Sequence, residues 1–288
     1  MLLKKIFSKI LKQFEKKDNN LLQPNFLQNV QKNSLLFYYG NIHSQCGQDG
    51  ILSEIFRRLN IEKGYFLEFG AWDGLYLSNC RFLYEKGWKG CFIEGNLKRS
   101  QNIYKYYDNI DVINDMVGFK NSKYTLLDEI LTTNKINTKK IDFISIDIDG
   151  YDLEIFKSIS FFPKVILIEG GFNFTPYLND STYLEIEQAA STSHGLQQPI
   201  TYLFHEYILK GYIPVCFLQD TYLIRKDLYD FDKFRISNSS INLYEDAYNF
   251  INNEWREKLL KLRSNNIIIK NIEETNLGSF SSNPLLYK

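Results

Sequence analysis

Five short apolar runs, separated by segments of helical periodicity, constrain the fold of this chain more than any other feature. They lie at residues 65–69, 90–94, 110–113, 141–147 and 165–169. Runs of this length that are apolar almost throughout are typical of strands buried on both faces of a parallel sheet. Their alternation with helical segments, such as residues 79–85 after the first run, predicts an α/β fold with helices on both faces of the sheet.

The last part of the sheet is predicted to be antiparallel. Residues 212–218 and 221–225 form two further apolar runs, and only Gln219 and Asp220 separate them. A parallel crossover needs a dozen residues or more, so these two runs form a hairpin. Helical segments flank the hairpin at residues 201–209 and 242–263.

Composition and charge exclude several classes of protein. The 34 basic and 34 acidic side chains cancel and the pI is about 6.8, so no overall field favours nucleic acid. Hydrophobic residues make up 44% of the chain, enough for a sizeable core. The four cysteines form no C-x-x-C pair, which favours free thiols and a cytoplasmic location. Apolar runs are too short for a transmembrane helix or a secretory signal.

We expect three parts in the chain. An amphipathic N-terminal helix and linker occupy residues 1–30, a ligand-binding domain occupies 31–228, and a C-terminal helical extension occupies 229–288. Residues 170–200 are too long for an ordinary connection and are predicted to be a loop that covers the active site.

The first twenty residues carry six lysines against two acids, a net charge of +4, with apolar residues at helical spacing. Such a helix can lie peripherally on the inner membrane surface. It can equally dock on its own domain or on a second subunit of a homo-oligomer, and the sequence leaves these interpretations open.

A glycine-containing segment, Glu-Phe-Gly-Ala-Trp-Asp-Gly at residues 68–74, follows the first strand, where open α/β sheets bind ligands. It lacks the second early glycine of the dinucleotide motif G-x-G-x-x-G, which disfavours a bound phosphate and a nicotinamide dehydrogenase. Glu94 ends the second strand, where an acid typically binds a ribose diol. These features indicate a nucleoside without phosphate, and S-adenosylmethionine fits them. Trp72 is interpreted as a core residue, with contact to the sulfonium as the alternative.

Four blocks, in this order and with this strand context, resemble the FkbM-type methyltransferases. They are residues 44–50, 66–74 with Ser78 and Asn79, 87–94, and 142–152. The resemblance covers about residues 40–228. It implies a class I methyltransferase fold, a Rossmann-like seven-stranded sheet with an antiparallel last strand, and S-adenosyl-L-methionine as the methyl donor.

The resemblance also implies roles for individual residues. Residues at the methionine end of the donor would be Glu68, Gly70 and Asp73. Glu94 would bind the ribose and Asp115 the adenine edge. Beside the same pocket would lie Ser44, Gln45 and Asp49. The sequence departs from the family at Gln48, where an acid is usual, and at residues 169–173.

Acidic residues end the fourth and fifth strands, and neighbouring strands lie about 4.8 Å apart, so Asp147, Asp149 and Glu169 should converge. Together with His194 of the long loop, these oxygen ligands could hold a divalent metal such as Mg²⁺ or Mn²⁺. The alternative is a proton shared among acids that accept hydrogen bonds from backbone amides. Both interpretations stay open, and either His194 or Asp149 could act as the general base.

The resulting hypothesis is an O-methyltransferase that acts on a sugar hydroxyl. Its substrate would be a saccharide, such as a nucleotide-linked sugar for a bacterial capsule or lipopolysaccharide. An N-methyltransferase of a small amine or amide is the enzymatic alternative, and a non-catalytic module with a donor-binding fold is the other.

Overall fold

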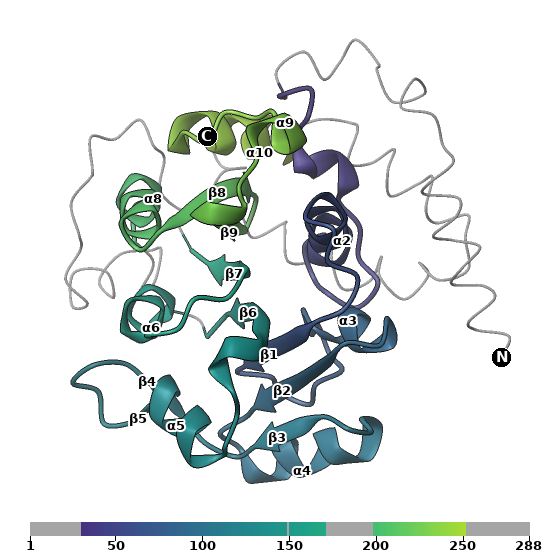
Figure 1. Ribbon diagram of the computed structural model, residues 1–288, viewed down its shortest axis with the longest axis vertical. Coiled ribbons are helices and arrows are strands. Elements are labelled where there is room, and N and C mark those ends of the chain that lie inside the picture. The colour runs from purple at the N-terminus through teal and green to yellow at the C-terminus, as the bar shows by residue number, and fades with distance from the viewer. Residues whose placement is uncertain (1–29, 149, 171–197, 252–288) are drawn as a thin grey trace, which may run out of the picture.

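A computed structural model describes residues 30–148, 150–170 and 198–251 (Figure 1). Its centre is one seven-stranded sheet with the order β3-β2-β1-β6-β7-β9-β8. The strands are β1 (Tyr65–Phe69), β2 (Lys89–Ile93), β3 (Asp111–Ile113), β6 (Ile141–Ile146), β7 (Val165–Glu169), β8 (Tyr212–Phe217) and β9 (Asp220–Arg225). All seven predicted strands are present, with ends that differ by a residue or two. The predicted α/β sheet of the Rossmann-like methyltransferase type is therefore confirmed.

The antiparallel strand lies inside the sheet rather than at its edge. β9 pairs antiparallel with both β7 and β8, so β8 at the edge runs parallel to the other strands. The hairpin turn is shorter than expected, because Asp220 is already the first residue of β9 and lies opposite Glu169. This shift places the Asp220 side chain at the edge where the parallel strands end.

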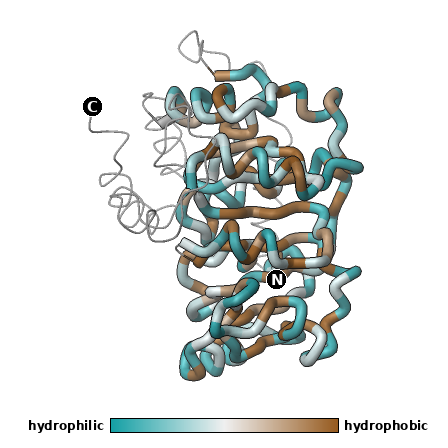
Figure 2. The backbone as a smooth tube through the Cα atoms, turned by 90° about the vertical axis from the view of Figure 1, so that its left-hand side faces the viewer, coloured by the Kyte–Doolittle hydropathy of each residue, from teal (hydrophilic) through white to brown (hydrophobic). Residues whose placement is uncertain are grey.

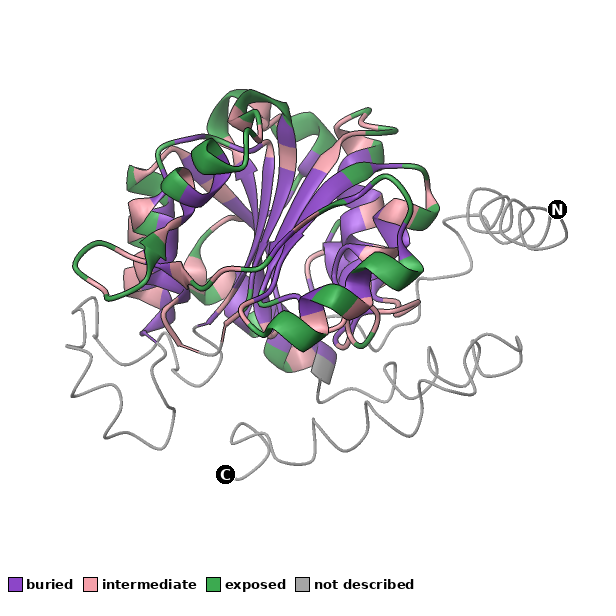
Figure 3. Cartoon of the chain, turned by 90° about the horizontal axis from the view of Figure 1, so that it is seen from below, coloured by how far each residue is buried: buried purple, intermediate pink, exposed green. Residues whose placement is uncertain are grey.

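Helices cover both faces of the sheet (Figure 3). In Figure 1, α6 and α8 lie on one side of the strands and α2 and α3 on the other. The helices are α2 (Gln48–Arg58), α3 (Arg81–Glu85), α4 (Leu97–Tyr106), α5 (Leu127–Thr133), α6 (Asp152–Ser158), α8 (Ile200–Leu209), α9 (Phe231–Phe234) and α10 (Ser240–Ile251). Short 3₁₀ turns are η2 (Leu35–Tyr38), η3 (Thr138–Lys140) and η4 (Lys226–Leu228), and β4 (Val117–Gly118) pairs with β5 (Thr125–Leu126).

The core consists of the strand interiors and the helix faces that cover them. Phe66, Phe143 and Ile166 are fully buried, and the central strands appear as hydrophobic stretches in Figure 2. Burial of such a side chain contributes about 1.5–3 kcal/mol. Gly90 of β2 is required by this packing, because a Cβ there would lie 2.4 Å from the Phe66 ring.

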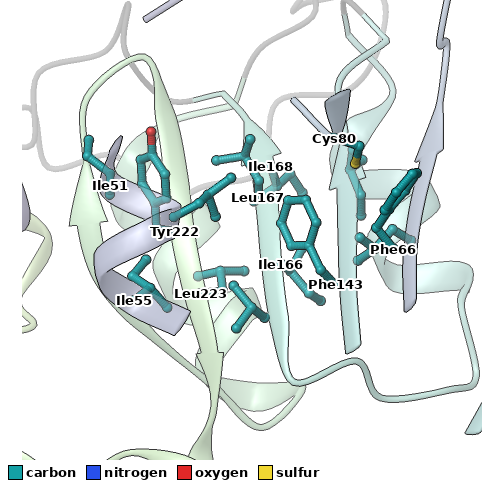
Figure 4. Close-up of a cluster of buried hydrophobic side chains, with 14 of the residues drawn as sticks. Ile51, Ile55, Phe66, Cys80, Phe143, Ile166, Leu167, Ile168, Tyr222 and Leu223 are labelled. Atoms are coloured by element: carbon teal, nitrogen blue, oxygen red, sulfur yellow. The ribbon is translucent and has the colours of Figure 1, made fainter. Parts of the chain in front are cut away.

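Helix α2 was not assigned from the sequence, which interpreted residues 44–50 only as a ligand-binding block. Its apolar face is buried, and Figure 4 shows Ile51 and Ile55 beside Tyr222 and Leu223 of β9. The N-terminal block is thus carried by a helix that packs on the sheet.

The chain after β9 packs against the sheet and against the N-terminal part of the described chain. Helix α10 packs against β8, α8 and η2, and Asp246 accepts hydrogen bonds from the backbone and side chain of Gln31 at 2.9 Å each. Phe250 contacts Tyr39 with ring centroids 5.4 Å apart.

Some sequence predictions lie outside the described residues. These are the helix at residues 1–20, Asp149, most of the 170–200 loop with His194, and the chain after residue 251. Within the described ranges, no helix is long and apolar enough to cross a membrane. All four cysteines are buried and free.

Candidate active site at the carboxyl edge of the sheet

The polar side chains predicted to bind ligands gather where the parallel strands end. Glu68 lies near the end of β1, and Glu94 follows β2 directly. Asp147 follows β6, and Glu169 ends β7. Because β9 runs in the opposite direction, its first residue, Asp220, lies at the same edge. The topology therefore collects carboxyl groups from five strands.

Glu68 organises the loop that leads into α3. Its buried carboxylate accepts hydrogen bonds from Ser78 Oγ at 2.7 Å, the Asn79 backbone N–H at 3.0 Å and the Cys80 backbone N–H at 3.2 Å. Burial raises the pKa of Glu68 to about 7 despite these donors. A role at the methionine end of the donor stays a prediction for this residue.

The turn after β1 brings Gly70 close to the backbone that follows β6, and its approach to a ligand stays a prediction. Gly70 has a positive φ of 68°, and a Cβ there would lie 3.0 Å from the carbonyl oxygen of Asp147. Asp73 accepts hydrogen bonds from the backbone N–H groups of Leu75 and Tyr76 at 2.9 and 2.8 Å. Asp73 thus closes its own turn, and its predicted contact with the donor stays a prediction.

Glu94 joins the loops that follow β1 and β2. One carboxylate oxygen accepts from the Trp72 backbone N–H at 2.8 Å and the other from the Asn96 backbone N–H at 2.8 Å. Each oxygen of a carboxylate has a second lone pair, so two further hydroxyl donors can bind. Glu94 is therefore fixed in place, with capacity left for a ribose diol.

The loops after β2 and β3 meet beside Glu94. Asn114 donates its side-chain amide to the Glu94 carbonyl oxygen at 2.7 Å. A Cβ at Gly95 would meet the Met116 side chain, so the two residues lie in contact. Asp115 accepts from the Met116 backbone N–H at 2.8 Å, and the Met116 side chain is exposed. The predicted adenine-edge residue thus lies beside an exposed apolar side chain.

Trp72 is not a core residue, contrary to the sequence interpretation. It is 51% exposed, has a positive φ of 52°, and lies under the Arg99 guanidinium, whose central carbon is 3.1 Å from the ring centroid. The backbone of Trp72 turns its N–H toward Glu94, which directs its side chain outward. Nothing in the sequence indicated the contact with Arg99.

The Ser44–Asp49 block is held by its own hydrogen bonds. The buried Asp49 carboxylate accepts from the backbone N–H groups of Ile42, His43 and Ser44 at 2.6, 2.6 and 2.9 Å. Ser44 Oγ accepts from the Asp49 backbone N–H at 3.1 Å. Burial raises the pKa of Asp49, and the three N–H donors oppose that rise. Gln45 accepts from the Asn41 side chain through its carbonyl oxygen at 2.7 Å. Contact of this block with the donor stays a prediction.

Gln48 links the same block to the hairpin. Its side-chain oxygen accepts the Cys46 backbone N–H, so its nitrogen faces Asp220 and donates to Oδ2 at 2.7 Å. Cys46 Sγ donates to the Gln219 side chain at 2.7 Å. An acid is usual at this position in the similar family, and it could bind Asp220 only if the two carboxyl groups shared a proton. The Gln48 amide donates a hydrogen bond to Asp220 without such a proton.

Sequence reasoning missed Asp152 and Asp220. Asp152 accepts from the backbone N–H groups of Ile148 and Gly150 at 2.9 Å each, and so closes the turn after β6. Burial, with repulsion from Asp147, raises the pKa of both Asp152 and Asp220 to about 7. The sequence offered a clue to Asp152, because an acid at the start of a predicted helix often accepts hydrogen bonds from backbone N–H groups. Asp220 had none, since its position depends on the pairing of β9 with β7.

The predicted metal set is described only in part. Asp147 and Glu169 lie at neighbouring positions of β6 and β7, whereas Asp149 and His194 are outside the described residues. Within the described ranges, no group of three His, Cys, Asp or Glu side chains could hold a metal ion. The metal site therefore stays a prediction.

Comparison with known proteins finds one similar family. Residues 79–195 match the model of the methyltransferase FkbM domain, which confirms the resemblance in the sequence. No curated protein matches the chain. Among solved structures, YjhP from E. coli matches at 13% identity over 92% of this chain and 94% of that chain, with a TM-score of 0.36.

The raised pKa values predict how stability depends on pH. Unfolding returns Glu68, Asp152 and Asp220 to ordinary values near 4.5, 3.8 and 3.8. The folded chain holds protons that the unfolded chain releases, so the free energy of unfolding should fall as pH rises from about 4 to 7. Each group contributes up to about 1.4 kcal/mol per pH unit. Urea unfolding at several pH values should show this fall, and Asp220→Asn should reduce it.

Asp232→Asn is the matched control, since Asp232 is exposed and should leave the slope unchanged. A wild-type stability that rises over this pH interval would contradict the assignment.

Proposed function

We propose that this chain, an S-adenosylmethionine-dependent methyltransferase with an FkbM domain, transfers the methyl group to a sugar hydroxyl. The observation that carries the proposal is the position of Glu94. It is held by two backbone N–H groups beside exposed apolar side chains, at the same edge of the sheet as the other carboxyl groups. A nucleoside donor fits Glu94 and the exposed apolar side chains beside it. A polyhydroxyl acceptor fits the other carboxyl groups of the edge.

S-adenosylmethionine supplies a methyl group on a positively charged sulfur. Glu94 would accept the two ribose hydroxyls, and Asp115 with Met116 would border the adenine. Trp72 is exposed, carries Arg99 on its ring and donates its backbone N–H to Glu94, so it would lie beside the same ligand. These residues orient the donor, and alignment of the reacting atoms is the main contribution to such a displacement.

The acceptor must lose a proton as it gains the methyl group. A new C–O bond forms, the C–S bond breaks, and the hydroxyl proton leaves. Asp147 is an exposed carboxylate at the acidic edge and is suited to receive it. Asp149 and His194, the bases predicted from the sequence, and a divalent metal remain proposals. A positioned base contributes about 10²- to 10⁴-fold to such a step.

The acceptor is proposed to be a nucleotide-linked sugar used for a bacterial surface polysaccharide. This part rests on the sequence resemblance. N-methylation of a small amine or amide is the alternative, and it needs no strong base.

Donor binding can be tested at Glu94. Glu94→Gln keeps the shape but replaces a charged acceptor, and a hydrogen bond to a charged group is worth about 1.5–3 kcal/mol. The dissociation constant of S-adenosylmethionine should therefore rise about tenfold or more in isothermal titration. Glu129→Gln, at an exposed acid of α5, is the control and should bind normally. Equal affinities for the two variants would remove Glu94 from the donor site.

The acceptor and the metal can be tested together. Purified protein with methyl donor and a panel of nucleotide sugars should yield a methyl ether, identified by mass spectrometry. If a metal assists, EDTA should abolish turnover, and Mg²⁺ or Mn²⁺ should restore it. Turnover that persists in EDTA would remove the metal, and methylation of amines alone would favour the N-methyltransferase.

Peripheral membrane contact through the basic N-terminal segment is also proposed on its charge pattern. Full-length protein should pellet with anionic liposomes, and a chain that starts at Asn19 should pellet less. Equal pelleting would contradict the membrane contact.

A further inference from the structure

We propose that Arg99 is a positioning residue of the donor site, which acts on Glu94 through Trp72 rather than by contact with the donor. The inference rests on the proposed function, because it takes Glu94 as the residue that binds the ribose of S-adenosylmethionine. It adds the side chain that keeps Glu94 and the two loops around it in the arrangement described above.

Trp72 has a backbone conformation that is unfavourable for a bulky residue. Its φ is 52°, in the left-handed region, and Gly70 and Gly74 on either side of it in the sequence have φ angles of 68° and 71°. A glycine adopts this region without a steric cost, whereas the Cβ of any other residue crowds the backbone. The conformation directs the Trp72 N–H to Glu94 Oε2 at 2.8 Å. Another contact must therefore offset the cost of the conformation that forms this hydrogen bond.

Arg99 makes such a contact. The central carbon of its guanidinium lies 3.1 Å from the centroid of the Trp72 ring, and a cation over an indole face is the strongest form of this interaction. Among the residues that the structure describes, no acid forms an ion pair with Arg99. The guanidinium is therefore committed to the aromatic ring, which it holds from one side.

The contact closes a ring of four residues around the Glu94 carboxylate. Glu94 Oε1 accepts the backbone N–H of Asn96 at 2.8 Å, and Asn96 Oδ1 accepts the backbone N–H of Arg99 at 3.1 Å, in the first turn of α4. From Arg99 the ring continues through the stacked indole to Trp72, whose N–H returns to the second oxygen of Glu94. Arg99 and Glu94 thus join the same two segments, the turn after β1 and the start of α4.

This arrangement gives Arg99 an effect on donor binding at a distance. Without the guanidinium, Trp72 can relax toward an ordinary backbone conformation, and its N–H then leaves Glu94. A carboxylate that has lost one of its two backbone donors must be ordered again when the ribose binds, which lowers the affinity. The loss should match the strength of a partly exposed cation–π contact, a factor of about five in the dissociation constant.

The test is a double-mutant cycle, with S-adenosylmethionine binding measured by isothermal titration. Arg99→Ala should raise the dissociation constant about fivefold. Trp72→Gly adopts the left-handed conformation unaided, so Arg99→Ala added to Trp72→Gly should change the dissociation constant by about twofold or less. Arg99→Lys keeps a cation above the ring and should recover part of the affinity. Lys98→Ala removes the exposed cation next in sequence and is the matched control, with normal binding expected.

Two results would overturn the inference. An equal loss from Arg99→Ala with and without Trp72 would show that Arg99 contacts the donor directly. Unchanged affinity in Arg99→Ala would show that the stack serves only the fold, as would a lowered unfolding temperature without a change in affinity. If either alanine or glycine variant fails to fold, Arg99→Gln and Trp72→Asn replace them, because glutamine keeps the aliphatic stem without charge and asparagine tolerates the left-handed region.

Failure of the proposed function gives different results. Normal donor binding by Glu94→Gln would remove Glu94 from the donor site, whatever the Arg99 variants do. Weak binding by Glu94→Gln with normal binding by Arg99→Ala would leave the donor site in place and overturn the role of Arg99 alone. The nature of the acceptor does not enter either measurement, because donor binding is titrated without a sugar.

Discussion

Burial of the sheet on both faces is the constraint on which the rest of this structure depends. Strand interiors such as those around Phe143 and Ile166 are mainly apolar, and the charged side chains of the central strands lie at or next to strand ends. The parallel strands end at one edge, and β9 begins there. A site rich in carboxyl groups follows from the topology once acids stand at those positions.

The acids of this edge also shape the loops around it. Glu68 holds the loop before α3, Glu94 joins two loops, and Asp152 closes the turn after β6. Asp49 does the same for the block before α2. Each carboxylate accepts backbone N–H groups that have no partner within a helix or strand, so loops and charges stabilise each other. Loss of one acid should disturb a loop as well as a ligand contact.

The candidate site has two parts, and acids that hold loops lie in both. At the end of β2, Glu94 is fixed with hydrogen-bonding capacity left, beside Trp72 and Met116. After β6 and at the start of β9, Asp152 and Asp220 lie close to Asp147 and have raised pKa values.

The sequence by itself determined the seven strands, the antiparallel hairpin and the positions of Glu68, Glu94, Asp147 and Glu169, because each depends on local periodicity or on a strand end. Only the tertiary structure decided that Trp72 faces outward under Arg99, that Gln48 donates to Asp220, and that Asp152 and Asp220 join Asp147. Gln48 and Asp220 are 172 residues apart. Their contact depends on the insertion of β9 between β7 and β8 and on the packing of α2 over it, and no local pattern encodes such a pairing.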